Sequence, residues 1–285
     1  MAPSQGINLQ RIAAFSEGDS GGNPAGVVLS DRLPDAGRMQ QLAAQIGYSE
    51  TAFAAPEGDA WRVRYFAPDM EVPFCGHATL ALSAALARAH GAGTFDLRLN
   101  AAAVRVEAWQ KSDAWHGALW SPPTRSQAAD HAAMAAVLDL FGLNAADLDQ
   151  RLPAARIHAG ADHFVLALKR RETLAAMRYD FASGQRLMRE QGWITIMLVQ
   201  AASDRAFHAR NAFAAGGVYE DPATGAAAAA FAGYLRDLGW PHGGAIQIEQ
   251  GVDMGVPARL HGDIEDQPGS PIRVHGRARW INSSR

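Results

Sequence analysis

The sequence predicts an α+β protein with two similar halves, in each of which strands wrap around one central apolar helix. Short alternating segments rich in β-branched residues recur along the chain, separated by glycine and proline. Two helical segments, 76–91 and 225–239, stay uncharged until their last turns. A helix that is apolar all round should be buried all round. The two segments start half a chain apart, which suggests an internal duplication.

The individual elements follow from the same patterns. Two segments, 35–47 and 130–142, are amphipathic and predict helices on the surface, the second ending in a glycine C-cap. The alternating segments predict strands over residues 7–15, 25–30, 61–68, 102–109, 162–169, 193–200, 245–251 and 271–280.

Composition narrows the class of protein. A length of 285 residues allows one large domain or two modest ones, and 48% hydrophobic residues suffice for a core. A net charge of −3 without blocks of like charge argues against nucleic acid or an anionic membrane as partner. The N-terminus has no apolar segment typical of a signal peptide, and no apolar run approaches the roughly 20 residues of a membrane span. We therefore expect a cytoplasmic protein.

The starts of the two apolar helices predict an anion site. The first turn of a buried helix leaves backbone N–H groups unpaired and carries the positive end of the helix dipole. Two such starts, opened by Gly76 and Gly225, suit a carboxylate or another oxyanion. His77 lies beside the first start, and Glu220 and Asp221 lie beside the second. The alternative for Asp221 is a purely structural role as a helix cap.

Five motifs occur in an order that resembles the PhzF-like phenazine-biosynthesis family. They are "GGNPAGVVLS" (21–30), "YSETAFA" (48–54), "RYFAPDMEVPFCGHATLA" (64–81), "YEDPATGA" (219–226) and "IEQGVDMGVPA" (248–258). The resemblance implies the diaminopimelate epimerase-like fold: two lobes, each a barrel-like sheet around a central helix, with the active site in the cleft between them. We expect an N-terminal lobe over 1–121, completed by a C-terminal strand around 272–285, and a C-terminal lobe over 122–271.

The resemblance also implies site residues and an activity. Glu50 matches the carboxylate that shuttles the proton, and His77 and Asp221 match polar residues that line the same site. The implied reaction is an isomerisation that moves a proton between carbons of a small carboxylate-bearing metabolite, with no cofactor and no metal. A homodimer is the implied assembly. The matched substrate-binding positions are Asn23, Ser49, Gly76, Gly225 and Ala226.

Several alternatives remain open at this point. Ala226 and Val256 depart from the serine and arginine common at these family positions, which puts the substrate in doubt and leaves a non-catalytic binding or interaction protein as second hypothesis. Glu50 as an ordinary surface carboxylate is the alternative to its catalytic role. Cys75 is the only cysteine, which excludes an intrachain disulfide, a cysteine-based zinc cluster and the two-thiol mechanism of related racemases.

Overall fold

The computed structural model describes residues 8–281, and the chain forms two compact units. Unit 1 runs to Trp120 and resumes at His275, and unit 2 is Ser121–Val274. Three parts of the predictions lie outside the described range. They are residue 7 of the first predicted strand, residues 282–285 of the predicted C-terminal strand, and the first seven residues, which were used to predict localisation.

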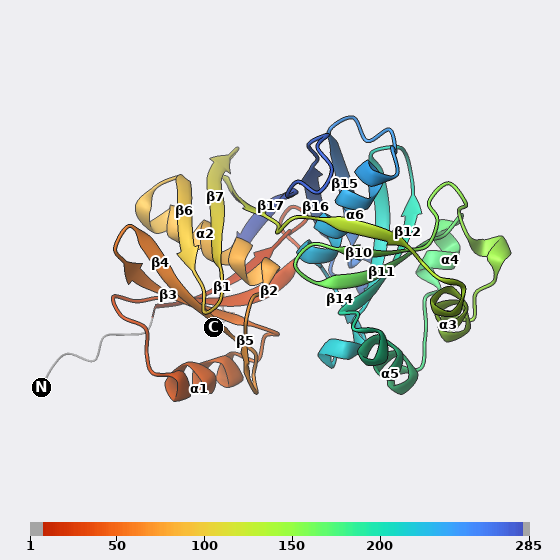
Figure 1. The fold of residues 1–285 in the computed structure, drawn as a ribbon. Coiled ribbons are helices and arrows are strands. Elements are labelled where there is room, and N and C mark those ends of the chain that lie inside the picture. Colours follow the sequence, from red (N-terminus) through yellow and green to blue (C-terminus); the bar gives the residue numbers. More distant parts are fainter. Residues whose placement is uncertain (1–7, 282–285) are drawn as a thin grey trace, which may run out of the picture. The chain divides into compact units, whose positions relative to one another are not determined.

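Unit 1 is a closed barrel of eight strands. Antiparallel pairs join β1 to β2, β3 to β4, β6 to β7 and β7 to β8, whereas β2–β3 and β4–β6 are parallel. Strand β17 closes the barrel by pairing with β8 and β1. The elements are β1 (Asn8–Ala14), β2 (Asn23–Leu29), α1 (Ala36–Ile46), β3 (Thr51–Glu57), β4 (Ala60–Phe66), β5 (Glu71–Val72), α2 (Gly76–His90), β6 (Gly93–Arg98), β7 (Ala103–Lys111), β8 (Ala114–Trp120) and β17 (Arg273–Trp280) (Figure 1).

Helix α2 fills the barrel of unit 1. It contacts β1, β2, β3, β6, β7 and β8, and every residue from His77 to Ala87 is buried. Small side chains allow this close packing, as Gly117 of β8 shows. A Cβ atom there would lie 2.5 Å from Oγ of Ser83 and 3.1 Å from the carbonyl oxygen of Leu80. The predicted central apolar helix is confirmed.

Unit 2 repeats the strand order of unit 1. Strands β10–β11, β12–β13 and β15–β16 are antiparallel, joined by the parallel pairs β11–β12 and β13–β15. This is the alternation of the first barrel, and it supports an internal duplication. The elements are β9 (Arg125–Ala128), α3 (His131–Phe141), β10 (Ala155–His158), β11 (Asp162–Ala167), α4 (Arg171–Ala175), α5 (Phe181–Gln191), β12 (Thr195–Ala201), β13 (Ala206–Ala212), β14 (Glu220–Asp221), α6 (Gly225–Asp237), β15 (Ala245–Gln250) and β16 (Ala258–Asp263).

The other predicted helices are also confirmed. Helix α6 is buried from Ala227 to Arg236 and packs on β9, β10, β11 and β16. Asp35 and Asp130 are the N-cap residues of α1 and α3, and their side chains accept from backbone N–H groups three residues on. Over residues 8–281, no helix combines the length and apolar character needed to cross a membrane.

Candidate active site

Asn23 reaches the start of α2 because a glycine precedes it. Gly22 has a φ of +81°, and a Cβ atom there would lie 2.7 Å from the carbonyl oxygen of Ala14. Glycine therefore lets the chain turn tightly against β1 as it enters β2. Asn23 is only 3% exposed, so its side-chain amide lies in the interior of unit 1.

Glu50 stands at the entry to β3 and is held by the neighbouring strand. Its carbonyl oxygen accepts a hydrogen bond of 3.2 Å from the backbone N–H of Gly26 in β2. The side chain is 18% exposed, and its Oε2 atom lies 3.4 Å from Nε2 of His77. This buried oxygen accepts no hydrogen bond from any residue in the range 8–281. Glu50 is thus not an ordinary surface carboxylate.

His77, in the first turn of α2, contacts the other polar side chains of the site. Its Nδ1 lies 3.2 Å from the side-chain nitrogen of Asn23, and its Nε2 lies 3.4 Å from Oγ of Ser49 and 3.4 Å from Glu50. An amide nitrogen can only donate, so Nδ1 is the acceptor. The proton of the neutral ring then sits on Nε2, facing Glu50.

A buried chain of hydroxyl groups fixes the residue before α2. Thr79 donates from Oγ1 to the carbonyl oxygen of Cys75 at 2.6 Å, so it accepts from the Tyr65 hydroxyl, also at 2.6 Å. Burial raises the pKa of Tyr65, which keeps the phenol protonated as the donor. The chain Tyr65–Thr79–Cys75 therefore holds the first turn of α2, and with it the backbone of His77.

The start of α2 offers unpaired donors. The first helical hydrogen bond runs from the N–H of Thr79 to Cys75 at 2.9 Å. Within the described part of the chain, no acceptor is bonded to the backbone N–H groups of Gly76, His77 and Ala78. These groups and the helix dipole make this turn attractive to an anion.

Cys75 joins Glu50 and His77 in a group whose candidate metal-ligand atoms lie within 4.8 Å of one another. Its sulfur lies 3.3 Å from Nδ1 of His77 and 3.8 Å from Nε2, whereas Glu50 faces Nε2. The sulfur lies nearer to Nδ1, but the 3.8 Å to Nε2 and the 3.4 Å from Nε2 to Glu50 are also separations that ligands of one ion can have.

In unit 2, Asp221 is tied to the turn before α6. Its Oδ2 accepts from Oγ1 of Thr224 at 2.6 Å, and its carbonyl oxygen accepts from Nε2 of Gln250 at 2.6 Å. Thr224, not Asp221, is the N-cap residue of α6. Asp221 therefore does not occupy the cap position itself. Glu220 is engaged elsewhere, in a buried ion pair with Arg210.

Gln250 and Gly251 shape this turn. Oε1 of Gln250 accepts from the backbone N–H of Thr224 at 3.2 Å. A Cβ atom on Gly251, which has a φ of +74°, would lie 2.4 Å from the carbonyl oxygen of Val256 and 2.9 Å from that of Pro222. Gly225 and Ala226 form the first turn of α6, whose first helical bond runs from Ala228 to Thr224 at 3.0 Å.

The predicted residues fall into two groups. The structure brings Asn23, Ser49, Glu50, Gly76 and His77 together in unit 1 and places Asp221, Gly225 and Ala226 around the start of α6 in unit 2. The sequence did not single out Tyr65, Thr79 or Gln250. Thr79 stands four residues after Cys75 at a helix start, a spacing typical of side-chain bonding to the backbone.

The unit 1 barrel around a buried helix, with a carboxylate and a histidine at the helix start, defines the class of fold and site to which this chain belongs. A family model described as phenazine biosynthesis-like protein matches residues 12–283. The chain belongs to this family.

Individual relatives agree. An uncharacterized isomerase of Mesorhizobium japonicum is 33% identical over 280 residues, which cover 90% of this chain and 91% of the relative. A solved PhzF-family protein of Bacillus anthracis has a TM-score of 0.84 at 21% identity, with 97% of each chain covered. A probable proline racemase of Agrobacterium radiobacter K84 has a TM-score of 0.64 at 12% identity, covering 96% of this chain and 91% of that chain.

These comparisons confirm the resemblance and the diaminopimelate epimerase-like fold expected from it. The family and the relative from Mesorhizobium japonicum identify the chain as an enzyme of the isomerase type.

Proposed function

We propose that this isomerase moves a proton between carbons of a small carboxylate-bearing metabolite, without a cofactor, and that Glu50 carries the proton. The observation behind this proposal is the buried Oε2 atom of Glu50, which accepts no hydrogen bond from residues 8–281. A buried, unsatisfied carboxylate oxygen costs stability, and such groups persist where function needs them. Its free lone pairs suit the removal and return of a C–H proton.

His77 assists by orientation. Its Nε2–H faces Glu50 at 3.4 Å and so keeps the carboxylate at the start of α2. The amides of Gly76 and His77 at the start of α2 hold the substrate carboxylate. They stabilise the enol-like charge that develops when the adjacent carbon loses its proton.

The roles of Asp221, Gly225 and Ala226 remain predictions from the resemblance. Asp221 would assist as a second acid, and the amides of Gly225 and Ala226 would bind the carboxylate. The hydrogen bond from Thr224 to the carboxylate of Asp221, and the bond from Gln250 to its backbone carbonyl oxygen, support its assignment because they hold this residue in place.

The reaction is tested by hydrogen exchange. Candidate carboxylic acids are incubated with the protein in deuterated water, and carbon-bound deuterium is followed by mass spectrometry. We expect the wild type to incorporate deuterium into one class of acid and Glu50→Gln to bind that acid without incorporation. Glu57→Gln is the matched control, since Glu57 is an exposed glutamate at the far end of β3, the strand that follows Glu50. Saturable binding without exchange in the wild type would instead identify a non-catalytic binding protein.

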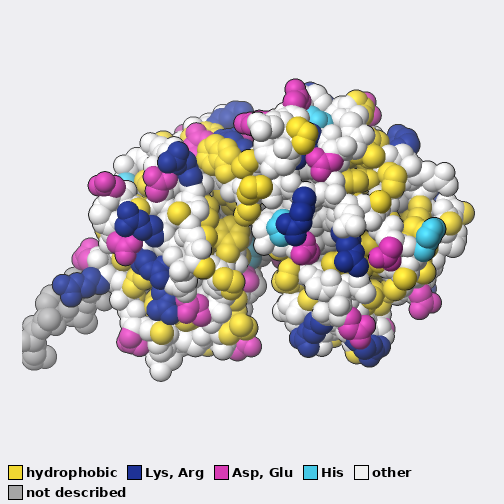
Figure 2. Space-filling model, in the orientation of Figure 1, with side chains coloured by type: hydrophobic (Ala, Val, Ile, Leu, Met, Phe, Trp, Pro, Cys, Tyr) yellow, Lys and Arg dark blue, Asp and Glu magenta, His cyan; other side chains and the backbone are white. Residues whose placement is uncertain are grey.

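Assembly and location complete the proposal. We expect a cytoplasmic homodimer, which sedimentation and cell fractionation would test. Acidic and basic side chains are interspersed on the face shown in Figure 2, in keeping with a small-molecule substrate rather than nucleic acid.

A further inference from the structure

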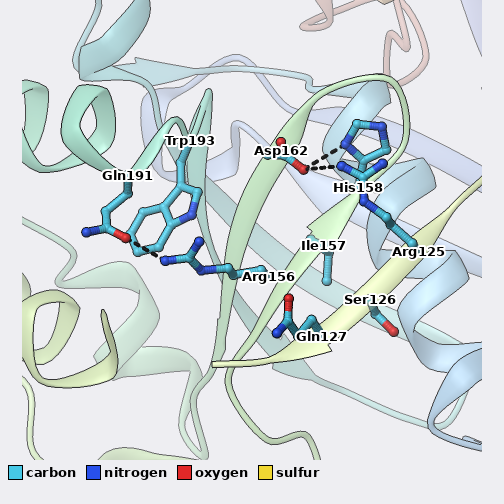
Figure 3. Close-up of a pocket in the computed structure, with 9 residues that line it drawn as sticks. All are labelled: Arg125, Ser126, Gln127, Arg156, Ile157, His158, Asp162, Gln191 and Trp193. Carbon is cyan, nitrogen blue, oxygen red and sulfur yellow. Dashed lines mark hydrogen bonds and ion pairs between the residues drawn. The ribbon is translucent and has the colours of Figure 1, made fainter. Parts of the chain in front are cut away.

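Unit 2 carries a polar cavity that is lined by other residues than those grouped around Glu50 and around Asp221. It has a volume of about 430 Å³, within the usual range for small-molecule sites. The cavity lies over β9, β10 and β11 and beside the end of α5 (Figure 3). Its main polar lining residues are Arg125, Arg156, His158, Asp162, Gln191 and Trp193.

Strand register brings these polar side chains onto one face. Arg125 of β9 pairs directly with His158 of β10, and His158 pairs with Asp162 of β11. Residues directly opposite each other in antiparallel strands share a face of the sheet. Arg156, two residues before His158, lies on that face as well. The sheet thus presents two arginines and a histidine together.

Trp193 supplies a buried donor without an acceptor. Its side chain is 1% exposed, and its Nε1–H bonds to no atom within residues 8–281. Figure 3 shows the indole nitrogen on the side of the ring that faces the other lining residues. Buried indole N–H groups usually have a partner. A ligand acceptor in the cavity would provide one.

The charges in the cavity are unequally compensated. Arg125 and His158 share one carboxylate, Asp162, at 3.1 and 2.7 Å. Arg156 donates through Nη2 to the neutral side chain of Gln191 at 2.6 Å, and its nearest carboxylate, Asp130, lies 3.9 Å away. Its Nε and Nη1 groups have no hydrogen-bond acceptor in the described structure. Arg156 therefore has one long ion pair, with Asp130, and keeps free donors beside the Trp193 ring, 5.4 Å from the ring centroid.

We propose that this cavity is a second binding site, which takes a small organic anion with a carboxylate or phosphate group. The guanidinium of Arg156 binds the oxyanion, and Nε1–H of Trp193 donates to it. Arg125 and His158, already paired with Asp162, border the anion and select for its size. The site is built from residues other than those of the proposed reaction, so it stands independently of that reaction.

Isothermal titration calorimetry at constant ionic strength tests the site with succinate and glycerol 3-phosphate, which separate a carboxylate ligand from a phosphate ligand. We expect saturable binding of at least one probe to the wild type. Arg156→Gln should weaken it about tenfold or more, since one charge-assisted hydrogen bond is lost. Arg189→Gln, which removes an exposed arginine of α5 outside the cavity, should bind as the wild type does. Binding of neither probe, or equal affinity in Arg156→Gln, overturns the proposal.

A second measurement does not depend on how Arg156→Gln folds. In the ¹H–¹⁵N spectrum of the wild type, the indole resonance of Trp193 is identified by its absence in Trp193→Phe. We expect this resonance to move progressively as the bound probe saturates the site. A Trp193 resonance that stays still at saturation contradicts the proposal.

Discussion

The side-chain nitrogen of Asn23 lies 3.2 Å from Nδ1 of His77 and thereby sets the tautomer of the imidazole. A strand residue fixed by a tight glycine turn thus decides which nitrogen of a helix residue carries the proton. Since that proton faces Glu50, the orientation of His77 depends on the closure of the barrel at β2.

Replacing Asn23 with leucine should disturb the reaction more than substrate binding. Leucine has a similar volume but no donor, so Nδ1 of His77 loses its amide donor and keeps only the weak contact with the Cys75 thiol. We expect kcat to fall about tenfold while KM changes little, because the loss of one buried hydrogen bond amounts to about 1–2 kcal/mol. The ¹⁵N shifts of the His77 ring should show reduced population of the Nε2–H tautomer. Unchanged ring shifts would refute the assignment. Asn100→Leu, at an exposed asparagine of the same unit, is the control.

Glu50→Asp tests position rather than charge. The aspartate keeps a carboxylate but withdraws it by about one methylene, roughly 1 Å or more from its place beside His77. We expect kcat to fall about 100-fold, as misplacement of a reacting group by 1 Å does in other enzymes. Wild-type turnover by Glu50→Asp would mean that Glu50 does not touch the reacting carbon. Glu57→Asp should retain full activity.

Cys75→Ala separates proton transfer by the carboxylate from proton transfer by the thiol. The thiol contacts His77 at 3.3 Å, but the proposed reaction uses only Glu50 for the proton. The variant loses one weak hydrogen bond, so we expect kcat to stay within about threefold of the wild type. A loss of about 100-fold or more, measured by the same deuterium exchange, would assign an acid or base role to Cys75.

Gly22→Ala should destabilise unit 1 for two reasons: alanine disfavours the left-handed backbone conformation, and its Cβ atom would clash with the backbone. Gly58, which has only the left-handed conformation, serves to separate the two. Gly22 and Gly58 have φ values of +81° and +63°, but only at Gly22 would a Cβ atom meet the backbone, at 2.7 Å from Ala14. Gly58→Ala should therefore cost about 1 kcal/mol for the left-handed conformation alone. We expect Gly22→Ala to cost about 2 kcal/mol more, measured by urea unfolding. Equal losses in the two variants would show that close packing at Gly22 is unimportant.

Local pattern predicted the two central helices of the fold, but it missed barrel strands such as β3, β6 and β8. The absence of charge over the first three turns of α2 and α6 predicted central helices, because only complete enclosure suits such a surface. Helix α5 was missed. Gly184 interrupts its middle, and the structure explains this glycine by the Tyr179 ring, which a Cβ atom would approach to 2.5 Å.

The polar contacts of the site could not be predicted in the same way. Asn23 and His77 are 54 residues apart, and Tyr65 and Thr79 lie on different elements, so their bonds depend on barrel closure. The motifs indicated Glu50 and His77 as site residues. They did not indicate the hydrogen bonds of the Tyr65 and Thr79 hydroxyl groups, which hold the start of α2. Packing around Trp193 likewise depends on strand register, which single-sequence patterns do not specify.

His163 predicts how stability depends on pH. The side chain is fully buried, donates from Nδ1 to Thr195 at 2.8 Å, and leaves Nε2 without a partner in residues 8–281. Thr195 itself donates to Asn211 at 3.0 Å, so it must accept from the ring, which places the proton of neutral His163 on Nδ1. Burial lowers the pKa of His163 from 6.5 to about 4.

Between pH 6.5 and about pH 4, His163 therefore binds a proton in the unfolded chain but not in the folded protein. Stability should fall as the pH drops from about 6.5 and level off near pH 4, with a total loss of about 3 kcal/mol from this group. His163→Asn keeps a donor for Thr195 but does not titrate, so its unfolding free energy should depend less steeply on pH over this range. His131→Asn, at an exposed histidine of α3, should retain the wild-type slope. If His163→Asn also retains that slope, His163 is not the group whose protonation destabilises the fold.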